Sequence, residues 1–121
     1  MPYPIIPPML ASSGAVPGNP SAWSWEVKWD GWRALVYVGE GIKVRTRTGR
    51  EVSDSLPELA GLVDALNGRT AVLDGELIAC AGGRPDFYAL TPRMAQTGRH
   101  ARWASVQVPV TLVAFDLLHL N

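Results

Sequence analysis

The sequence predicts an α+β fold built on an antiparallel β-sheet with flanking helices. Two observations predict this class. Short apolar runs, several with a period of two residues, end at clusters of Gly, Pro, Asn or Asp, as strands joined by turns do. Two other segments carry helical spacing or helix-start signals. Many short strands with few helices are typical of an antiparallel sheet.

The first part of the chain is expected to form an arm and three strands. Residues 1–20 hold six of the ten prolines and predict an extended arm. Residues 23–28 are predicted to form a strand, and residues 33–38, apolar on both faces, an internal one. A turn at 39–41 leads to a third strand at 42–47. Its basic face carries Lys43, Arg45 and Arg47, which alternate with Ile42, Val44 and Thr46.

A helix is predicted next, with a cap within residues 53–55 and an end at Gly68. Its apolar residues at helical spacing are Leu56, Leu59, Val63 and Leu66. Residues 70–79 follow as a strand, and residues 81–83 as a turn.

The last part of the chain predicts a short helix and a final strand. The helix covers residues 86–95 but is interrupted by Pro92, where Thr91 can cap a new turn. Residues 99–102, Arg-His-Ala-Arg, are expected to be an exposed basic loop. The final strand lies within residues 106–118.

Composition excludes several classes of protein. Eleven basic and eleven acidic residues cancel, so any affinity for nucleic acid has to come from local patches. The single cysteine, Cys80, cannot form an internal disulfide and fits a reducing compartment; its apolar surroundings predict a core position. No apolar run reaches membrane-spanning length, and the N-terminus lacks the pattern of a signal peptide.

The segment at residues 28–33, Lys-Trp-Asp-Gly-Trp-Arg, carries the strongest chemical signal. A lysine amine is a nucleophile when it is unprotonated, and Lys28 is the candidate. Asp30 is a candidate metal ligand, and the guanidinium of Arg33 suits phosphate. Gly31 lets the backbone approach a ligand closely. A charged hairpin with its turn at Asp30 and Gly31 explains the same residues, because Asp-Gly is a common hairpin turn.

Three further segments favour the chemical interpretation. Residues 28–33 resemble the KxDGxR motif of the covalent nucleotidyltransferases, which comprise ATP-dependent DNA ligases, RNA ligases and capping enzymes. In that family's order, residues 45–50 resemble the S/T-R-x-G motif, residues 73–77 the DGE motif and residues 115–118 the FDLL motif. With the Pro-Met-Leu-Ala run at 8–11, the resemblance is strongest to the bacterial end-joining DNA ligases. It extends from about Pro8 to Asn121.

The resemblance implies a role for each matching residue. Lys28 would attack the α-phosphorus of ATP and become adenylated. Glu26 would contact the adenine amino group, Arg33 would contact ribose or phosphate, and Glu76 would contact ribose or metal. Phe115 would stack on adenine, and Asp30 would bind metal. Arg47 would bind the 5′-phosphate of the DNA nick.

Blander interpretations stay open for several of these residues. Glu26 also fits a solvent-facing strand position, and Asp30 fits a turn. Arg33 fits an ion pair with Asp30 or Glu26, and Phe115 fits an ordinary core aromatic. Asp74 lies two residues from Glu76, so both carboxylates can face one pocket, although Asp74 can equally stabilise the turn into Gly75.

The family's later glutamate and lysine motifs and its OB-fold domain do not occur in these 121 residues. We therefore expect residues 21–121 to be the N-terminal half of an adenylation domain that follows the arm at 1–20. The parent would join DNA nicks or ends in repair, through lysine-AMP and DNA-adenylate intermediates. The chain alone is expected to be inactive or very weak and to self-associate.

The resemblance further implies ATP as co-substrate and Mg²⁺ or Mn²⁺ as cofactor. Nicked or broken double-stranded DNA and end-joining proteins are the expected partners, in the bacterial cytoplasm in association with the nucleoid. The alternative functions are an RNA ligase, a capping-type nucleotidyltransferase or a non-catalytic fragment that binds nucleic acid.

Overall fold

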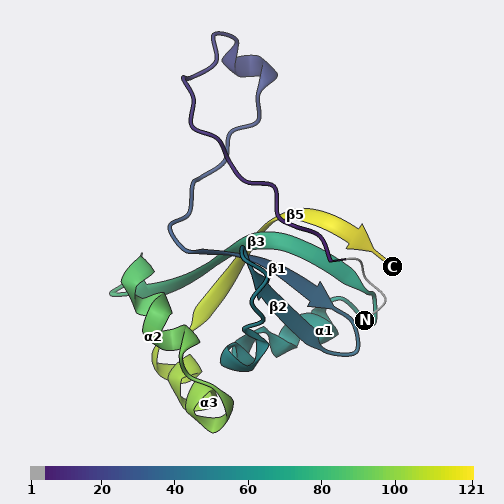
Figure 1. The fold of residues 1–121 in the computed structure, drawn as a ribbon, viewed down its shortest axis with the longest axis vertical. Coiled ribbons are helices and arrows are strands. Elements are labelled where there is room, and N and C mark those ends of the chain that lie inside the picture. Colours follow the sequence, from purple (N-terminus) through teal and green to yellow (C-terminus); the bar gives the residue numbers. More distant parts are fainter. Residues whose placement is uncertain (1–4) are drawn as a thin grey trace.

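The computed structural model describes residues 5–121 and shows a five-stranded antiparallel sheet (Figure 1). Strand β3 (Ala71–Ala81) is central, with β1 (Trp32–Val38) and β5 (Val110–Leu120) paired to it on either side. Strand β2 (Ile42–Thr46) extends the sheet beyond β1, and the short β4 (Arg84–Pro85) pairs with the end of β3. The expected antiparallel α+β class is confirmed.

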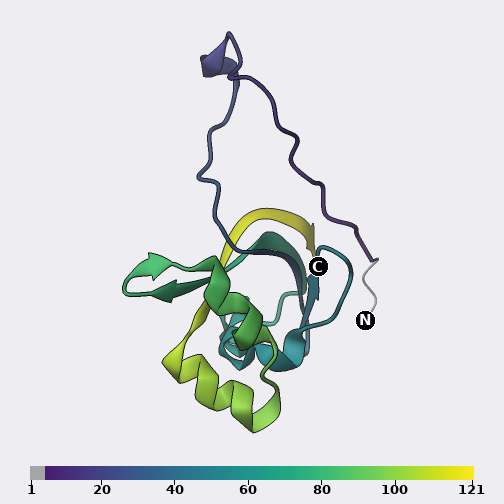
Figure 2. The ribbon, with the colours of Figure 1, turned by 60° about the vertical axis from the view of Figure 1, so that its left-hand side comes forward.

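The helices are short and cover one face of the sheet, as Figures 1 and 2 show. The α-helices are α1 (Gly61–Ala65), α2 (Leu90–Met94) and α3 (Gly98–Gln107). The 3₁₀ turns are η1 (Pro20–Ala22), η2 (Ser53–Ser55), η3 (Pro57–Ala60) and η4 (Phe87–Ala89). No helix among residues 5–121 is long and apolar enough to cross a membrane.

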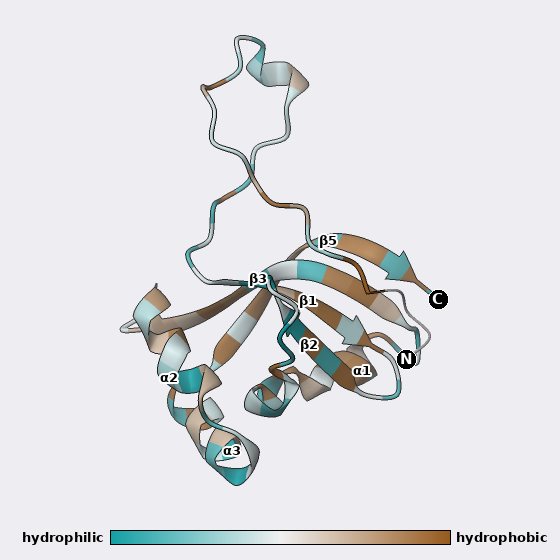
Figure 3. Cartoon of the chain, viewed as in Figure 1, coloured by the Kyte–Doolittle hydropathy of each residue, from teal (hydrophilic) through white to brown (hydrophobic). Residues whose placement is uncertain are grey.

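Strand β1 is buried on both faces, as its sequence predicted, because it lies between β2 and β3. Successive side chains of a strand point to opposite faces. Ala34, Val36 and Val38 pack into the main core beneath the helices, whereas Leu35 and Tyr37 form a smaller cluster on the other side. Figure 3 shows hydrophobic residues along β1 and the neighbouring strands of the sheet. The side away from the helices is called the open face below.

The N-terminal segment runs away from the open face and returns to it. Residues 5–31 lie outside the sheet, with η1 at the tip of the excursion (Figures 1 and 2). Ile6 anchors the outgoing end: its N–H donates to the hydroxyl oxygen of Tyr37 at 3.3 Å, and its side chain packs on the open-face cluster. Residues 1–4 of the predicted arm fall outside the described part of the chain.

The strand predicted at residues 23–28 is wrong. These residues have no regular structure and are all exposed. An isolated extended segment gains neither ladder hydrogen bonds nor a buried face, so the apolar pattern alone cannot make it a strand. Its tryptophans instead bond locally, with Trp23 Nε1 donating to Asn19 and Trp25 Nε1 to the carbonyl of Pro20.

The basic loop predicted at residues 99–102 is wrong in conformation, because these residues form the first turns of α3. Ala101 and Ala104 give this helix a narrow buried stripe, while Arg99 and Arg102 are exposed as expected. Two small residues are a weak apolar signal, which explains why the sequence suggested a loop.

Cys80 is exposed rather than part of the core. It lies near the end of β3, where that strand has run past β1 and β5 and pairs only with β4. Apolar neighbours in sequence therefore do not bury it.

The two predicted helices form in shorter pieces. The apolar spacing before Gly68 is divided among η2, η3 and α1, and the expected end is confirmed, with Asn67 and Gly68 both at positive φ. Pro92 does not interrupt α2, because it lies in the first turn, where backbone N–H groups have no acceptor within the helix and a missing N–H costs no hydrogen bond. The cap lies earlier than predicted: the side chain of Asp86, not of Thr91, accepts a hydrogen bond, from Tyr88 N.

A buried arginine ties the helical side together. Arg93 of α2 donates to the carbonyls of Ser55 and Val108, and its Nη2 contacts both carboxylate oxygens of Glu58 at 2.6 Å. Glu58 also accepts from the N–H of Val110 at the start of β5. One guanidinium thus satisfies polar groups from the η2–η3 segment and from the connection between α3 and β5.

We predict that Arg93→Ala lowers the free energy of unfolding by about 3–5 kcal/mol, because it leaves the Glu58 carboxylate and two carbonyls without their donor. Urea denaturation of the purified chain measures this loss. The exposed Arg102→Ala on the same side is the control and should change stability by less than about 0.5 kcal/mol. Equal effects of the two substitutions would contradict a central role for the Arg93 network.

Candidate nucleotide-binding site

Arg33 is the centre of a polar cluster on the open face. It lies on β1, and its Nε and Nη2 donate to Asp74 Oδ1 and Oδ2 of β3, both at 2.7 Å. Its guanidinium carbon also lies 4.9 Å from the centroid of the Phe115 ring on β5, within cation–π distance. Three strands therefore meet at one side chain, and the hydrogen bonds with Asp74 raise the pKa of Arg33.

Glu76 lies beside this group, directly opposite Arg33 in the β1–β3 register. Partial burial raises the pKa of Glu76 above its ordinary value of 4.5, and the nearby Asp30 and Asp74 act in the same direction. The charge of Arg33 and a backbone hydrogen bond from Gly31 oppose this rise without overcoming it. Partial removal of water from around this carboxylate therefore disfavours its negative charge.

The glycine of the first motif is required by packing. A Cβ at Gly31 would collide with the carbonyl oxygen of Leu77 and lie 3.1 Å from the Cγ of Glu76. The chain entering β1 can therefore approach β3 closely only because residue 31 has no side chain. This approach brings Asp30 and Arg33 beside the carboxylates of β3. The close approach seen here is to the neighbouring strand, whereas the approach to a ligand stays a prediction.

The glycine of the DGE motif has a similar role on the other side of β3. A Cβ at Gly75 would collide with the carbonyl oxygen of Val113 and lie 3.0 Å from the Cα of Ala114. The β3–β5 register also shifts here: Asp74 pairs with Asp116 and Gly75 with Ala114, which leaves Phe115 as an extra residue. Bulges of this kind re-aim side chains, and this one accompanies the contact of Phe115 with Arg33. The ring is 40% exposed, so it keeps a surface for a ligand.

Lys28 and Glu26 lie on the chain that leads into β1, and both are exposed. Neither makes a hydrogen bond or ion pair with any other described residue. Asp30 is also exposed, and its negative charge contributes to the raised pKa of Glu76. The structure thus groups Asp30, Arg33, Glu76 and Phe115, with Lys28 close in sequence but not held in place.

The basic residues of β2 border this cluster. Arg45 is opposite Leu35 and Lys43 opposite Tyr37, and paired residues share a face, so both side chains lie on the open face. Arg47 was predicted as the last residue of this strand, but β2 ends at Thr46 and Arg47 lies in the exposed turn that follows. A band of positive charge therefore lies at one side of the site, with β1 between it and β3.

The carboxylates do not make a complete metal site by themselves. Within residues 5–121 no three His, Cys, Asp or Glu side chains are grouped so as to hold a metal ion. Asp30 and Glu76 can supply at most two ligands. This number suits Mg²⁺, which usually takes one or two carboxylates and completes its shell with substrate phosphates and water.

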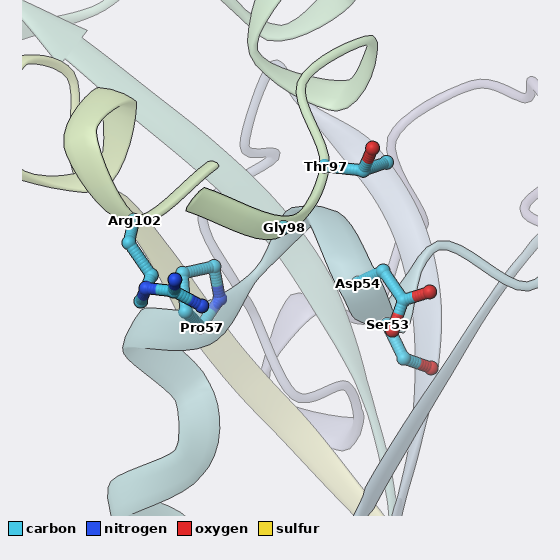
Figure 4. A pocket seen from close by; sticks show the side chains of 6 residues that line it. All are labelled: Ser53, Asp54, Pro57, Thr97, Gly98 and Arg102. Carbon is cyan, nitrogen blue, oxygen red and sulfur yellow. The ribbon is translucent and has the colours of Figure 1, made fainter. Parts of the chain in front are cut away.

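A hollow of about 570 Å³ lies elsewhere, on the helical side of the molecule. Figure 4 shows that its side chains come from η2 and η3 and from the start of α3. The lining residues are Ser53, Asp54, Pro57, Thr97, Gly98 and Arg102. It contains none of the residues that the motifs identify, so the candidate site is a surface of the sheet rather than this hollow.

The partner of Arg33 was not identified from the sequence. We expected a ligand for Arg33, with an ion pair to Asp30 or Glu26 as the alternative, whereas the observed partner is Asp74. The available signal was the i, i+2 spacing of Asp74 and Glu76. That spacing puts both on one face but cannot show which strand lies opposite.

Comparison with known proteins gives a consistent result. Residues 8–121 match the family model described as the ATP dependent DNA ligase domain. The chain is 39% identical over 119 residues to the multifunctional non-homologous end joining DNA repair protein LigD of Mycobacterium tuberculosis, covering 96% of this chain and 14% of that protein. It is 40% identical over 122 residues to a probable DNA ligase of Streptomyces griseus, covering 96% of this chain and 24% of the relative.

Solved structures agree with this result. A mycobacterial DNA ligase D complexed with ATP and MES matches with a TM-score of 0.62 and 35% identity, over 79% of this chain and 29% of that one. The present chain therefore spans less than a third of each of these relatives and structures.

We predict that Glu76→Gln changes the free energy of unfolding in a pH-dependent way. The substitution should stabilise the fold more at neutral pH than at acidic pH. As pH rises through 4.5, the unfolded chain loses its Glu76 proton before the folded protein does. The unfolded state then binds fewer protons, so stability falls towards neutral pH. Glutamine removes this penalty.

Urea denaturation at about pH 4 and pH 7 measures the effect. Glu40→Gln, in the exposed turn between β1 and β2, reports the effect of losing one carboxylate elsewhere. A stability difference for Glu76→Gln that is the same at both pH values would contradict the prediction.

Proposed function

The chain belongs to the family of ATP-dependent DNA ligase domains, and on this premise we propose that it supplies the nucleophilic lysine and part of the ATP pocket of a DNA ligase. The observation that supports this most directly is the convergence of three separate motifs on Arg33. The first motif carries Arg33 itself, the DGE motif supplies Asp74 and Glu76, and the FDLL motif supplies Phe115. Strand pairing brings these residues together on the open face, where Glu76 and Phe115 keep surface for a ligand.

The proposed first step is self-adenylation of Lys28. Its neutral amine attacks the α-phosphorus of ATP, a nitrogen–phosphorus bond forms, and the bond from the α-phosphorus to the bridging oxygen breaks. Pyrophosphate leaves, and the amine proton passes to solvent. The exposure of Lys28 leaves it free to reach a nucleotide bound on the open face.

The rest of the cluster would bind and orient the nucleotide. Arg33 offers donors to phosphate or ribose, and Glu76 accepts from ribose hydroxyls. Phe115 would stack on adenine, an interaction worth about 1–3 kcal/mol for bases on aromatic rings. Glu26, exposed two residues before Lys28, is assigned to the adenine amino group.

Asp30 and Glu76 would hold Mg²⁺ or Mn²⁺ together with phosphate oxygens. A bound divalent ion neutralises phosphate charge and so favours attack at phosphorus. The raised pKa of Glu76 fits this assignment, since a nearby cation would lower that pKa and favour the carboxylate.

We assign the second and third steps to the larger enzyme that this chain would belong to. AMP passes from Lys28 to a 5′-phosphate of DNA, and a 3′-hydroxyl then attacks and releases AMP. Arg47 and the neighbouring Arg45 and Arg50 are proposed to hold the DNA phosphates. A charge-neutral chain can do so where basic side chains are grouped locally, as Lys43 and Arg45 are on the open face.

The biological setting follows the relatives' printed names. We propose that the parent enzyme joins broken double-stranded DNA in non-homologous end joining, with other end-joining proteins, in the bacterial cytoplasm at the nucleoid. Residues 1–20 would be an arm and residues 21–121 part of the adenylation domain. The unpaired edge of β5, with Leu117 and Leu120 about half exposed, favours self-association of the isolated chain.

A second candidate is a fragment that binds nucleic acid without catalysis. The basic residues on the open face favour it, and they need no ATP. Incubation with α-labelled ATP and a divalent metal separates the two functions. An acid-labile, hydroxylamine-sensitive protein label indicates self-adenylation, whereas DNA binding without label indicates the non-catalytic fragment.

We predict that Lys28→Ala abolishes the covalent label in a ligase polypeptide that contains this chain together with the later motifs. Lys43 is the one other lysine of the chain, and it lies on β2 outside the motif. Lys43→Ala is therefore the matched control and should keep most of the label. Wild-type labelling of Lys28→Ala would disprove the assignment of the nucleophile.

We predict that Arg47→Ala in the same polypeptide preserves self-adenylation but slows AMP transfer to nicked DNA by about tenfold or more, the effect of losing one charged phosphate contact. Arg47 is exposed and no described residue links it to the Arg33 cluster. Single-turnover assays of each step measure this division. A drop in adenylation as large as the drop in nick sealing would place Arg47 in the ATP site instead.

A further inference from the structure

The two hydrogen bonds between Arg33 and Asp74 use one particular edge of the guanidinium. A guanidinium has five N–H groups: one on Nε and two on each terminal nitrogen. Asp74 accepts from Nε and from Nη2, which together form the side edge. Both N–H groups of Nη1 and the outer N–H of Nη2 remain. The end edge of the fork consists of this N–H of Nη2 and the adjacent N–H of Nη1. Nη1 makes no hydrogen bond to any residue in the described range.

The orientation of the guanidinium is fixed from a second direction. The Phe115 ring covers it at 4.9 Å. The guanidinium thus contacts β3 through one edge and lies over the Phe115 ring of β5. A side chain that normally has large rotamer freedom is held in one place before any ligand arrives.

Asp74 is well suited to holding Arg33, because it is nearly buried. It is 4% exposed, whereas the neighbouring Glu76 is more accessible. A buried carboxylate needs a partner, since leaving it unpaired is costly. Both oxygens of Asp74 are therefore committed to Arg33, while Glu76, directly opposite Arg33, keeps its carboxylate for other use.

We infer that Asp74 is a positioning residue: it fixes Arg33 against Phe115 so that the end edge of the guanidinium presents two donors to a pair of nucleotide oxygens. This inference rests on the proposed nucleotide-binding function. The two oxygens belong either to phosphate or to the ribose diol, and both match a forked donor. Asp74 itself touches no ligand and acts through Arg33.

Asp74→Asn is the test variant, because asparagine keeps the shape of aspartate. Its amide nitrogen would face an N–H of Arg33, donor against donor, so at least one of the two hydrogen bonds is lost. Glu58→Gln is the matched control. It removes a carboxylate from the other arginine–carboxylate pair, that of Arg93, on the helical side.

The first measurement needs no nucleotide. In the NMR spectrum of the chain, we expect the Nε–H signal of Arg33 to exchange slowly with water and to be shifted upfield by the Phe115 ring. Asp74→Asn should broaden or remove this signal and leave the backbone amide spectrum of the core unchanged. Glu58→Gln should preserve it. A sharp, shifted signal that persists in Asp74→Asn would overturn the inference.

The second measurement is nucleotide affinity, followed by NMR titration with ATP, adenosine and inorganic tripolyphosphate. Whichever of these ligands loses affinity in Arg33→Ala should lose about the same factor in Asp74→Asn, about tenfold or more for charged hydrogen bonds. Adenosine sensitivity indicates ribose, and tripolyphosphate sensitivity indicates phosphate.

The double variant decides between positioning and mere structural support. If Asp74 acts through Arg33, Arg33→Ala with Asp74→Asn is no weaker than Arg33→Ala alone. Additive losses would overturn the inference. Absence of any ATP response in the wild type would instead count against the proposed nucleotide binding, and the Arg33 signal would then decide the positioning role.

Discussion

The ion pair between Arg33 and Asp74 is the interaction on which the open face depends. It crosses from β1 to β3, is nearly buried at its acidic end, and places the guanidinium on the aromatic ring of β5. Removing water from both groups is costly, and two short hydrogen bonds offset that cost only when the strands hold their register. The three motifs that meet here therefore need one another. A shift of β1 by one residue would leave the buried carboxylate of Asp74 unpaired, and a shift of β5 would move Phe115 away from Arg33.

That register depends in turn on two positions where no side chain fits. Gly31 precedes β1 and faces β3, whereas Gly75 lies within β3 and faces β5, and at each a Cβ would collide with a backbone carbonyl oxygen. The first close approach brings Asp30 next to Glu76, and the second accompanies the bulge that leaves Phe115 unpaired in the ladder. Glycine in both motifs is thus explained by strand packing, without any appeal to contact with a nucleotide. A motif that looks purely catalytic in sequence also encodes how closely its strands pack.

The sequence predicted the sheet and the residues of the site better than it predicted their partners. Strands β1, β2 and β3 were predicted because burial on one or both faces leaves a clear period in the apolar residues. The segment at 23–28 shows the same period but has no neighbouring strand to pair with in the described part of the chain. Whether a neighbouring strand is present depends on the tertiary fold and not on the local sequence. Helix α3 was missed because two buried alanines are a weak apolar stripe. The pairing of Asp74 with Arg33, 41 positions apart, depends on strand order, which no local pattern encodes.

The main core and the proposed site lie on opposite faces of one sheet. Beneath the sheet, Arg93 satisfies its neighbours and the main core excludes water. Above it, Glu76 carries a charge that its surroundings disfavour, and Lys28 has no partner among the residues described. The roles proposed for Lys28 and Glu76 require an amine and a carboxylate that stay unsatisfied until a ligand arrives, so neither group can contribute to folding. The core on the helical face supplies the stability that lets the open face keep polar groups without partners. Arg33 serves both the fold and the proposed site: one edge of its guanidinium is bonded to Asp74, and the other edge is free for a ligand.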